Sequence, residues 1–308
     1  MLGGLPVFII VSFVSFAVNQ FPVPSDYQLV PLANGGKTLF SAGYGEKMHP
    51  GLGPQAEAEL LYVRQLNICG RLQGEAGEFV IWDIGLGAAA NAIAALRAAR
   101  EIPGRLRLVS FDNTREPLKF ALNHAAELEY PAGFEGQLAE LLHSNRITFT
   151  NGKLSVNWEF HLCDFPLFLK SEIGIRKSQI SSPHAIFYDA FSPAKNPAMW
   201  TLSVFENLFR ALDPARPCAL TTYSRSTLLR VTLLLAGFHV GVGHATGLKE
   251  ETTIAANALD LIAEPLNARW LERALRSDCA EPLREPVYTR APLSPATAEL
   301  LRRHPQFK

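Results

Sequence analysis

The sequence predicts an α/β fold with a mostly parallel sheet covered by helices on both faces. Apolar strand-like segments alternate with helical segments from residue 79 to residue 236, which is the order of a parallel sheet with crossover helices. Three of the expected strands also end in an acidic residue. Two further apolar segments, 238–243 and 252–257, are expected to pair as a closing hairpin that adds one antiparallel strand.

The composition is that of a globular chain with a sizeable core. Its 308 residues are 48% hydrophobic and 19% charged, which argues against wholesale disorder. The formal net charge is zero, so the overall charge would not hold nucleic acid, and any such contact must be a local patch. The four cysteines lie far apart without a C-x-x-C pair, so we expect reduced thiols of a cytoplasmic protein and no metal site.

Residues 1–20 form an apolar N-terminal extension. The run from Leu5 to Val18 is short for a membrane span, has no Lys or Arg before it, and has no clear A-x-A cleavage site after it. Three interpretations stay open: an upstream start or local extension, a secretory or anchor segment, and a buried strand. Because the rest of the chain has cytoplasmic character, we expect no stable membrane association.

Residues 21–70 are expected to form a hairpin and a helix ahead of the main sheet. The segment 27–44 alternates in polarity around Asn34-Gly35, a strong hairpin turn signal. Pro54 is typical of the first turn of a helix, and residues 56–66 have helical spacing.

Residues 71–262 are expected to form the core and residues 263–308 a C-terminal helix and tail. Within the core, strands are expected at 79–84, 106–112, 184–191 and 219–224, with two more in 146–164, and helices at 89–100, 115–128 and 198–212, with a further helix ending at 236. Residues 130–145 look like an insertion. The C-terminal part is expected to be a helix at 268–276 followed by an extended tail.

The first core strand leads into a glycine turn and an alanine-rich helix, IWDIGLGAAANA (81–92). Gly85-x-Gly87-x-x-Ala90 fits the fingerprint of dinucleotide-binding domains, in which helix-terminal amides hold a pyrophosphate. It fits a pocket for S-adenosyl-L-methionine about as well, because glycines let the backbone approach a ligand. Taken alone, the turn leaves both cofactors open.

Acidic residues at the strand ends favour S-adenosyl-L-methionine. Asp83, Asp112 and Asp189 end strands whose carboxyl ends would meet at one edge of an open parallel sheet. Asp112 is expected to accept hydrogen bonds from both ribose hydroxyls. It lies further downstream than the acid of NAD-binding domains usually does. Asp164 is expected to accept from the adenine amino group with Phe165 as a wall, although an Asp here suits a helix cap equally well. A cationic sulfonium suits an acidic pocket without a phosphate site.

The segment YDAFSPAKNPAMW (188–200) is the most informative. Asp189 ends an apolar strand, and Pro193 and Pro197 then fix a rigid loop at the rim of the sheet. We therefore expect Asp189 to lie near the point where a transferred methyl group would emerge.

These segments resemble the MnmC-like methyltransferases, which methylate the aminomethyl group on the wobble uridine of tRNA. The resemblance runs from about residue 27 to residue 256, and DAFSPAKNPAMW is its most distinctive part. TLFSAGYGEKMHPGLGPQAEA (38–58) and WDIGLGAAANAIAAL (82–96) also match. The family also occurs fused to an FAD-dependent oxidase domain, for which 308 residues leave no room, so the stand-alone form is expected.

The resemblance implies a Rossmann-like methyltransferase fold and the conversion of 5-aminomethyl-2-thiouridine to 5-methylaminomethyl-2-thiouridine, with tRNA as a transient partner. With the residue patterns, it gives the expected site. The cofactor contacts are Asp83, Gly85, Gly87, Asn91, Asp112, Asp164, Phe165 and Glu57, and the substrate contacts are Tyr44, His49, Phe191, Lys195, Asn196 and Trp200, with Glu46 in the same cleft.

The expected chemistry centres on Asp189. A primary amine with a lysine-like pKa of about 10.4 is mostly ammonium at pH 7, so the site must bind it beside a carboxylate and take its proton. Asp189 is the expected catalytic residue. Candidates for stacking on a splayed-out base are Phe191, Trp200 and Tyr188, of which Tyr188 fits the core better; Lys195 and Arg225 are candidates for phosphate contacts or for a solvated surface.

The sequence departs from the family pattern in ways that bear on the substrate. Ala89 replaces the third glycine of the turn, which is tolerable where the turn is not left-handed. A basic pair is reduced to Arg230 with Val231, and a Lys-Arg-Glu run becomes Lys249-Glu250-Glu251. Because tRNA phosphates would be held there, a methyltransferase acting on a different amine stays open, as do an NAD-dependent oxidoreductase and an inactive binding module.

Overall fold

The computed structural model describes residues 26–174, 180–247 and 250–308. The apolar segment 1–20, for which three interpretations stand, lies outside these residues. Among the helices of the described ranges, none combines the length and the apolar character needed to cross a lipid bilayer.

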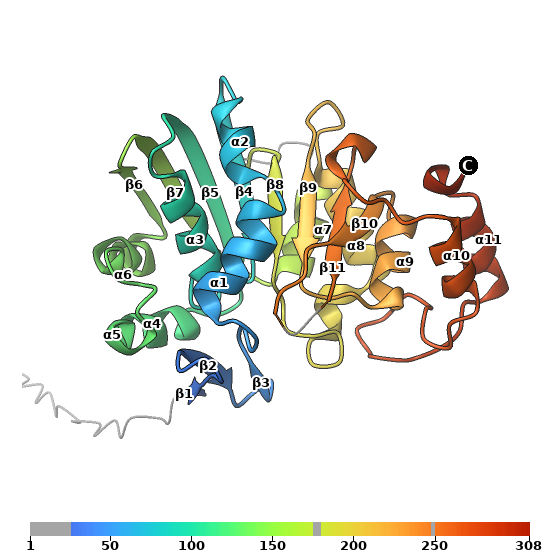
Figure 1. Cartoon of the computed structure of the whole chain (residues 1–308), viewed down its shortest axis with the longest axis horizontal. Coiled ribbons are helices and arrows are strands. Elements are labelled where there is room, and N and C mark those ends of the chain that lie inside the picture. The colour runs from blue at the N-terminus through green and yellow to red at the C-terminus, as the bar shows by residue number, and fades with distance from the viewer. Residues whose placement is uncertain (1–25, 175–179, 248–249) are drawn as a thin grey trace, which may run out of the picture.

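An eight-stranded sheet forms the centre of the molecule, in the order β10-β11-β9-β8-β4-β5-β7-β6 (Figure 1). Strands β4, β5, β7, β8 and β9 are parallel to one another, as predicted. The chain runs outward from β4 through β5 to one edge and then returns to β8 on the other side of β4. This reversal at β4 creates a crevice at the carboxyl ends of the strands, where open α/β sheets bind ligands. The strands are β4 (Glu78–Ile84), β5 (Gly104–Asp112), β6 (Arg146–Asn151), β7 (Leu154–Leu162), β8 (Ala185–Tyr188), β9 (Ala219–Thr222), β10 (His239–Gly243) and β11 (Thr252–Ala256).

Antiparallel strands lie toward both edges of the sheet. The predicted closing hairpin is confirmed, because β11 pairs antiparallel with both β9 and β10. At the other edge, β6 pairs antiparallel with β7; both strands were predicted within 146–164, but their antiparallel pairing was not. Gly152 and Lys153 connect these two strands directly after Asn151, and Gly152 has φ of 63°, so an Asn-Gly turn signal was present in the sequence.

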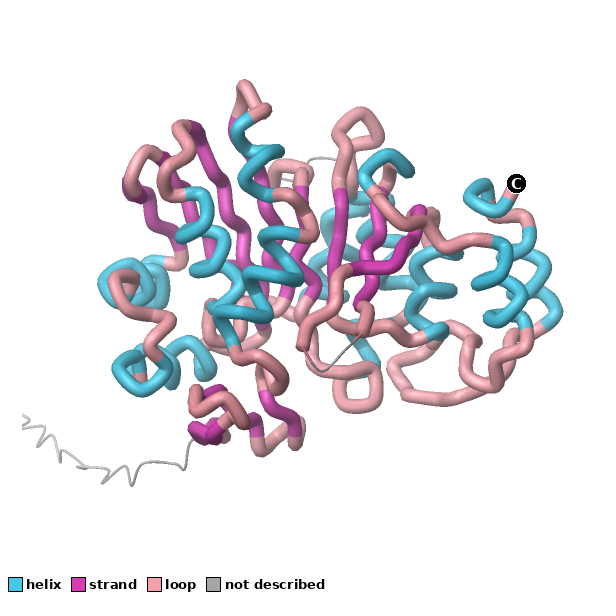
Figure 2. Tube along the Cα trace, in the orientation of Figure 1, coloured by secondary structure: helices cyan, strands magenta, loops and turns pink. Residues whose placement is uncertain are grey.

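Helices pack on both faces of this sheet, in two layers that Figures 1 and 2 show in front of it and behind it. Side chains of β4 alternate between the two: Phe79 and Ile81 join the core under α1 to α6, whereas Val80 and Trp82 join the core under α7 to α9. The first layer holds α1 (Pro54–Ala58), α2 (Ile68–Gln73), α3 (Ala90–Ala99), α4 (Glu116–Asn123), α5 (Ala125–Leu128) and α6 (Glu135–Ser144); the second holds α7 (Phe165–Gly174), α8 (Leu202–Ala211) and α9 (Thr227–Leu235), with the short turns η2 (Pro197–Trp200) and η3 (Leu259–Leu261) in loops.

The predicted helix at 56–66 contains a π-helical turn, η1 (Glu59–Arg64). Its wider spacing leaves the carbonyl of Leu61 free to accept a hydrogen bond from the Thr221 hydroxyl of β9, at 3.0 Å. The turn ties the N-terminal helix to the sheet and places Leu61 and Tyr62 next to each other against β8 and β9. Such turns are frequent at functional sites.

A separate three-stranded sheet lies at the carboxyl ends of the central strands, at the bottom of Figure 1. It consists of β1 (Tyr27–Pro31), β2 (Lys37–Ser41) and β3 (Glu46–Lys47). The β1–β2 hairpin turns at Asn34-Gly35, as predicted, and Gly35 has φ of 85°. This small sheet faces the crevice made by the chain reversal.

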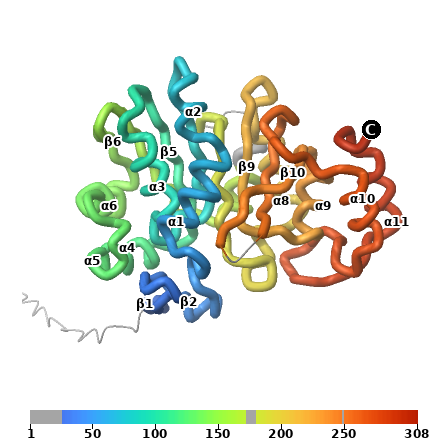
Figure 3. Tube along the Cα trace, in the orientation of Figure 1, coloured from blue at the N-terminus to red at the C-terminus, as the bar shows by residue number. Residues whose placement is uncertain are grey.

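The C-terminal segment packs beside β10 and α9, at the red end of the trace in Figure 3. It contains α10 (Ala268–Leu275), as predicted, and also α11 (Pro295–Arg302) and η4 (Pro305–Phe307) in what was expected to be an extended tail. Gln306 bonds to the edge of β10 through its side-chain amide: its oxygen accepts from the Val240 N–H at 2.8 Å, and its nitrogen donates to the Val240 carbonyl at 2.7 Å.

Candidate functional site

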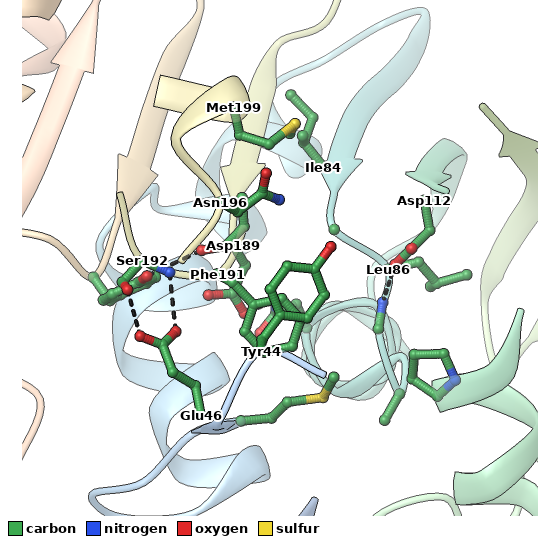
Figure 4. A pocket seen from close by; sticks show the side chains of 18 of the residues that line it. Tyr44, Glu46, Ile84, Leu86, Asp112, Asp189, Phe191, Ser192, Asn196 and Met199 are labelled. Atoms are coloured by element: carbon green, nitrogen blue, oxygen red, sulfur yellow. Dashed lines mark hydrogen bonds between the residues drawn. The ribbon is translucent and has the colours of Figure 1, made fainter. Parts of the chain in front are cut away.

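A cavity of about 450 Å³ lies in the crevice between the carboxyl ends of β4, β5 and β8 and the small N-terminal sheet (Figure 4). This volume falls in the range of pockets that hold cofactors and drug-sized ligands. Most of its wall comes from segments distant in sequence: residues 44–51, residues 57–62, the glycine turn after β4, the ends of β5 and β7, and the loop after β8.

The glycine turn forms one wall and depends on left-handed backbone. Gly85 has φ of 90°, and a Cβ there would lie 2.7 Å from the Asp189 carbonyl oxygen. The glycine therefore allows the turn to approach the loop after β8. Gly87 has φ of 51°, and a Cβ there would meet Met48 only at an ordinary contact distance of 3.7 Å, so only its backbone conformation requires glycine. Ala89 has φ of 63° and stands in the left-handed region, so the condition for tolerating its methyl group is not met.

Asp112 lies across the mouth of this turn, where Figure 4 shows it beside Leu86. One carboxylate oxygen accepts from the Gly87 N–H at 2.9 Å and the other from the Thr114 N–H at 3.1 Å. Burial raises the pKa of Asp112 despite these hydrogen bonds. The Asp112 carboxylate already accepts the hydrogen bond of the Gly87 N–H, which a pyrophosphate would need. Its negative charge would also repel a pyrophosphate. The turn thus suits a ligand with hydroxyl groups better than a dinucleotide.

Asp189 joins Asn91 and His49 on the β8 side of the cavity. The Asn91 side-chain N–H₂ donates to Oδ2 of Asp189 at 2.8 Å, and His49 Nε2 lies 3.2 Å from the same oxygen. His49 Nε2 is also 3.3 Å from Oδ1 of Asn91. The three residues come from the loop after β8, the start of α3 and the loop after β3, and they form a closed triangle of contacts that borders the cavity.

The charges in this triangle support one another. Burial alone would raise the pKa of Asp189, but hydrogen bonds from His49, Asn91 and Tyr62 and the charge of His49 hold it below its usual value. Burial alone would lower the pKa of His49, but its hydrogen bond with Asp189 and the charges of Asp189 and Glu57 raise it. These contacts therefore favour the ionised carboxylate of Asp189 and increase the affinity of His49 for a proton.

A seam between the small N-terminal sheet and the loop after β8 closes one side of the cavity. The Ser192 N–H donates to Glu46 at 3.1 Å, and the Ser192 hydroxyl donates to the other oxygen of that carboxylate. The Tyr44 and Phe191 rings stack on each other with centroids 4.1 Å apart, as seen in Figure 4. The aromatic residues expected for the substrate thus face each other at the cavity wall.

Three more expected residues line the cavity in different ways. Glu57 accepts from the Gly51 and Leu52 N–H groups at 2.5 and 2.8 Å, so it shapes the loop that carries His49. Phe165 is buried against Phe111 on the β5 side. Asn196 lies on the other side, where Figure 4 shows its side chain between Asp189 and Met199.

Asp164 lines the cavity and also caps a helix. It is exposed, and its Oδ1 accepts from the Leu167 N–H at 2.9 Å in the first turn of α7. Both interpretations of this residue therefore have a structural counterpart, because the second carboxylate oxygen has no hydrogen-bond partner among the described residues.

Three expected residues do not line the cavity. Trp200 is completely buried, and its indole N–H donates to the Phe191 carbonyl at 2.7 Å, so it supports the loop from the core side. Lys195 is exposed, with its ammonium group beside Gly45 at the outer face of the seam. Asp83 is completely buried inside β4, where it accepts from the Ser110 hydroxyl at 2.9 Å. Burial raises the pKa of Asp83 to about 8.

The basic residues expected near a nucleic acid are engaged with acids. Arg230 is buried in α9 and donates to the Thr253 hydroxyl, the Thr252 carbonyl and Glu251, the last at 3.2 Å. Arg225 lies on the surface with its guanidinium 3.7 Å from Glu250. Tyr188, assigned to the core from the sequence, is completely buried and donates to the Met199 carbonyl.

Sequence reasoning missed two tyrosines at the site. Tyr62 of η1 is completely buried behind the cavity wall, and its hydroxyl donates to the Tyr188 carbonyl at 3.5 Å, next to Asp189. The Tyr223 hydroxyl donates to the Ala190 carbonyl at 3.0 Å, next to Asp189. Helical spacing for Tyr62 and a strand end for Tyr223 were visible in the sequence, but neither indicates where the hydroxyl points. Across the described ranges, no three His, Cys, Asp or Glu side chains converge as metal ligands would.

Comparisons with known proteins indicate a methyltransferase. Residues 138–258 match a family described as S-adenosyl-L-methionine-dependent methyltransferases. The tRNA 5-methylaminomethyl-2-thiouridine biosynthesis bifunctional protein MnmC of Ralstonia nicotianae is 31% identical over 232 residues, which cover 71% of this chain and 33% of that protein. The protein of the same name from Leptospira interrogans is 29% identical, with 64% and 30% covered. The chain thus spans about a third of the length of the curated relatives it matches.

A solved structure gives the same fold. MnmC2 from Aquifex aeolicus superposes with a TM-score of 0.64 at 24% sequence identity, covering 91% of this chain and 84% of that one. The parallel sheet with two helical layers therefore corresponds over nearly its full extent. Fold, family match and sequence likeness together identify the chain as an S-adenosyl-L-methionine-dependent methyltransferase related to the MnmC-like family.

Proposed function

We propose that the chain binds S-adenosyl-L-methionine in the cavity and methylates the 5-aminomethyl group of the wobble uridine of tRNA. The observation that carries this proposal is the position of Asp189. Its carboxylate borders the cavity beside the glycine turn, and its contacts with His49 and Asn91 hold its pKa below the usual value. A methyl donor at the turn and an amine at Asp189 would then meet inside one cavity.

The residues around the cavity fit this cofactor chemically. Asp112 supplies carboxylate oxygens for ribose hydroxyls, and Asp164 and Phe165 lie on the same side for the adenine. Five acids line the cavity, against Lys47 and His49 as basic residues; the acids are Glu46, Glu57, Asp112, Asp164 and Asp189. An acidic lining favours a cationic sulfonium over the pyrophosphate of NAD. The cofactor, when bound, supplies the electrophilic methyl group.

Asp189 is proposed to bind the acceptor as an ammonium ion and to orient its nitrogen. Methyl transfer needs the reacting nitrogen within about 3–3.5 Å of the methyl carbon, in line with the bond that breaks. A carboxylate fixed by two side-chain contacts holds the nitrogen in one place and so reduces the entropic part of the barrier. Tyr44 and Phe191, stacked at the wall of the cavity, offer ring faces to a splayed-out base once they separate.

The tRNA acceptor is supported by the names of the relatives, each of which is described as acting in biosynthesis of 5-methylaminomethyl-2-thiouridine. A second candidate keeps the cofactor and replaces the tRNA with another amine. It is favoured by the ion pairs Arg230–Glu251 and Arg225–Glu250, which neutralise basic groups that phosphates would otherwise use.

Calorimetry with S-adenosyl-L-methionine and with NAD tests the cofactor. We expect saturable binding of the first and none of the second. Binding of NAD alone would overturn the proposal. Replacement of Asp112 by Asn is the matched variant, because it keeps the shape but removes the charge, and it should weaken binding of S-adenosyl-L-methionine by about tenfold for one charge-assisted hydrogen bond.

Mass spectrometry of tRNA from a strain lacking the protein tests the acceptor. The unmethylated 5-aminomethyl nucleoside should accumulate, and the purified chain should methylate that tRNA in vitro. Binding of S-adenosyl-L-methionine with full methylation in the deletion strain, and no activity on its tRNA, would favour the second candidate.

A further inference from the structure

We propose that Nδ1 of His49 accepts the proton that the acceptor amine must lose, and that Asn91 is the positioning residue that makes Nδ1 the accepting nitrogen. The inference rests on the proposed amine methylation and adds to it. Asp189 then holds the ammonium ion and the imidazole together, and it is not itself the final proton acceptor.

The hydrogen bonds around Asn91 fix the protonation pattern of the ring. An ionised carboxylate only accepts hydrogen bonds, so the Asn91 atom 2.8 Å from Asp189 must be its N–H₂ group. The opposite amide orientation would place two acceptor oxygens against each other. Oδ1 of Asn91 therefore points toward His49 Nε2, 3.3 Å away. Nε2 of His49 faces two acceptors, Asn91 Oδ1 and Asp189 Oδ2, and must carry a hydrogen in every protonation state of the ring.

Nδ1 is consequently the only ring nitrogen that titrates. It has no hydrogen-bond partner among the described residues, and it is not among the buried polar atoms left without one, so it reaches the solvent-accessible space of the cavity. The His49 side chain is 14% exposed and belongs to the cavity wall. His49 also has φ of 51°, a left-handed conformation that is uncommon for histidine and that turns the loop toward Asn91.

The charges that face His49 come from several elements. Asp189 lies in the loop after β8 and Glu57 in α1; Asn91, Tyr62 and the buried Asp83, whose pKa of about 8 leaves it mostly uncharged at neutral pH, complete the surroundings. The negative charges raise the pKa of His49 above its usual value. The lowered pKa of Asp189 makes that carboxylate a weak base, whereas the imidazole has an affinity for protons closer to that of an amine.

An N–H bond of the bound ammonium breaks, its proton forms an N–H bond at the lone pair of Nδ1, and the electron pair stays on the amine nitrogen. That pair forms the new N–C bond to the methyl group as the C–S bond breaks, and the electrons of the C–S bond remain on sulfur. The imidazolium then returns its proton to water.

The first test uses the ligand-free protein with ¹⁵N-labelled histidine. The NMR signals of His49 should show Nε2 protonated at all pH values and Nδ1 titrating at a pH above the usual histidine value. Asn91→Ala removes one of the two acceptors that face Nε2, so a minor tautomer with its hydrogen on Nδ1 should appear while the signals of the half-buried His124 stay unchanged. A neutral His49 with its hydrogen on Nδ1 would overturn the proposal.

The second test compares the pH dependence of kcat with cofactor affinity, at saturating substrates. Wild type should lose activity toward acid pH with the midpoint seen for His49 by NMR. His49→Gln should lower kcat by about 10²-fold and remove that acid limb. Its affinity for S-adenosyl-L-methionine by calorimetry should change less than about threefold, and the control His124→Gln should behave as wild type.

The outcomes of these tests distinguish the role of His49 from the proposed methyl transfer itself. Retention of the acid limb in His49→Gln overturns the role of His49, as does a large loss of cofactor affinity with kcat intact, which would make His49 a cofactor ligand. Absence of methyl transfer by the wild-type protein would refute the proposed function, and in that case the NMR measurement still decides which nitrogen of His49 accepts a proton.

Discussion

Two ion pairs of equal length have different roles in the molecule. Asp189–His49 and Arg230–Glu251 both have N···O distances of 3.2 Å. Arg230 is 3% exposed, and all three of its side-chain nitrogens donate to protein atoms. It therefore holds α9 against the start of β11, a contact region that we call the corner between α9 and β11. His49 keeps one ring nitrogen open to the cavity. The comparison teaches that the unsatisfied atom of a buried pair, more than its distance, distinguishes a reactive site from a structural one.

Replacing Asp189 with Ala should have the largest effect. Without the carboxylate, the ammonium ion loses its counter-charge and His49 loses its partner, so methyl transfer should fall by about 10²–10⁴-fold. Affinity for S-adenosyl-L-methionine should persist, as measured by calorimetry. Asp189→Asn, which keeps the shape, is the control for folding. Full activity of Asp189→Ala would place the reaction elsewhere in the cavity.

Replacing Arg230 with Met should have the opposite signature. The change leaves Glu251, the Thr252 carbonyl and the Thr253 hydroxyl without a donor, and it should lower the free energy of unfolding by about 2–3 kcal/mol. Urea titration measures this, while kcat at a temperature where the variant is folded should equal that of wild type.

The surface residue Arg225 provides the matched control. Arg225→Met breaks an exposed pair and should leave the urea midpoint nearly unchanged. A loss of methyl transfer in folded Arg230→Met, with stability intact, would make the corner between α9 and β11 part of the active site and break the comparison.

Replacing Ala89 with Gly should stabilise the protein slightly. Ala89 stands in the left-handed region at the start of α3, where an L side chain costs about 1–2 kcal/mol and glycine does not. After the larger backbone entropy of glycine in the unfolded chain is subtracted, a gain of about 0.5 kcal/mol is expected in urea titration. Ala98→Gly, inside the same helix, should destabilise by about 1 kcal/mol. Equal losses in both variants would show that the turn is not strained.

Replacing Glu250 with Lys should have the smallest effect and concerns tRNA alone. Reversal of this charge frees Arg225 and adds a cation near it, so tRNA affinity should rise by about two- to threefold at low salt and less at high salt. Filter binding at two salt concentrations measures this. An unchanged tRNA affinity at both would indicate that the surface around Arg225 does not contact the acceptor.

Much of the fold followed from local signals. Asn34-Gly35, Pro54 and the alternation of strands with helices each determine structure within a few residues of themselves, and the elements they predicted are present. The predictions failed where tertiary packing decides. Residues 135–144 and 295–302 were not assigned to helices, because polar surface helices stabilised by a few buried leucines carry a weak periodic signal.

The site was predictable in its location but not in its contacts. The rule that parallel strands end at one edge brought Asp112 and Asp189 to the same cavity. His49 contacts Asn91, 42 positions away, because the His49 backbone is left-handed. No residue type in this segment indicates that conformation. Trp200 was assigned to the substrate because an aromatic residue near a loop suits stacking and core packing equally; its complete burial reveals a supporting role.

The side chain of Gln306 has a consequence for self-association. An exposed strand edge is a template on which another chain can add a strand, and this is a common start of aggregation. On β10 that edge is occupied by the Gln306 amide, which copies the donor and acceptor of a peptide group, and by the Leu266 N–H, which donates to the Val240 carbonyl. These groups of the same chain take the place of a neighbouring strand, and they prevent the β10 edge from pairing with a strand of another molecule.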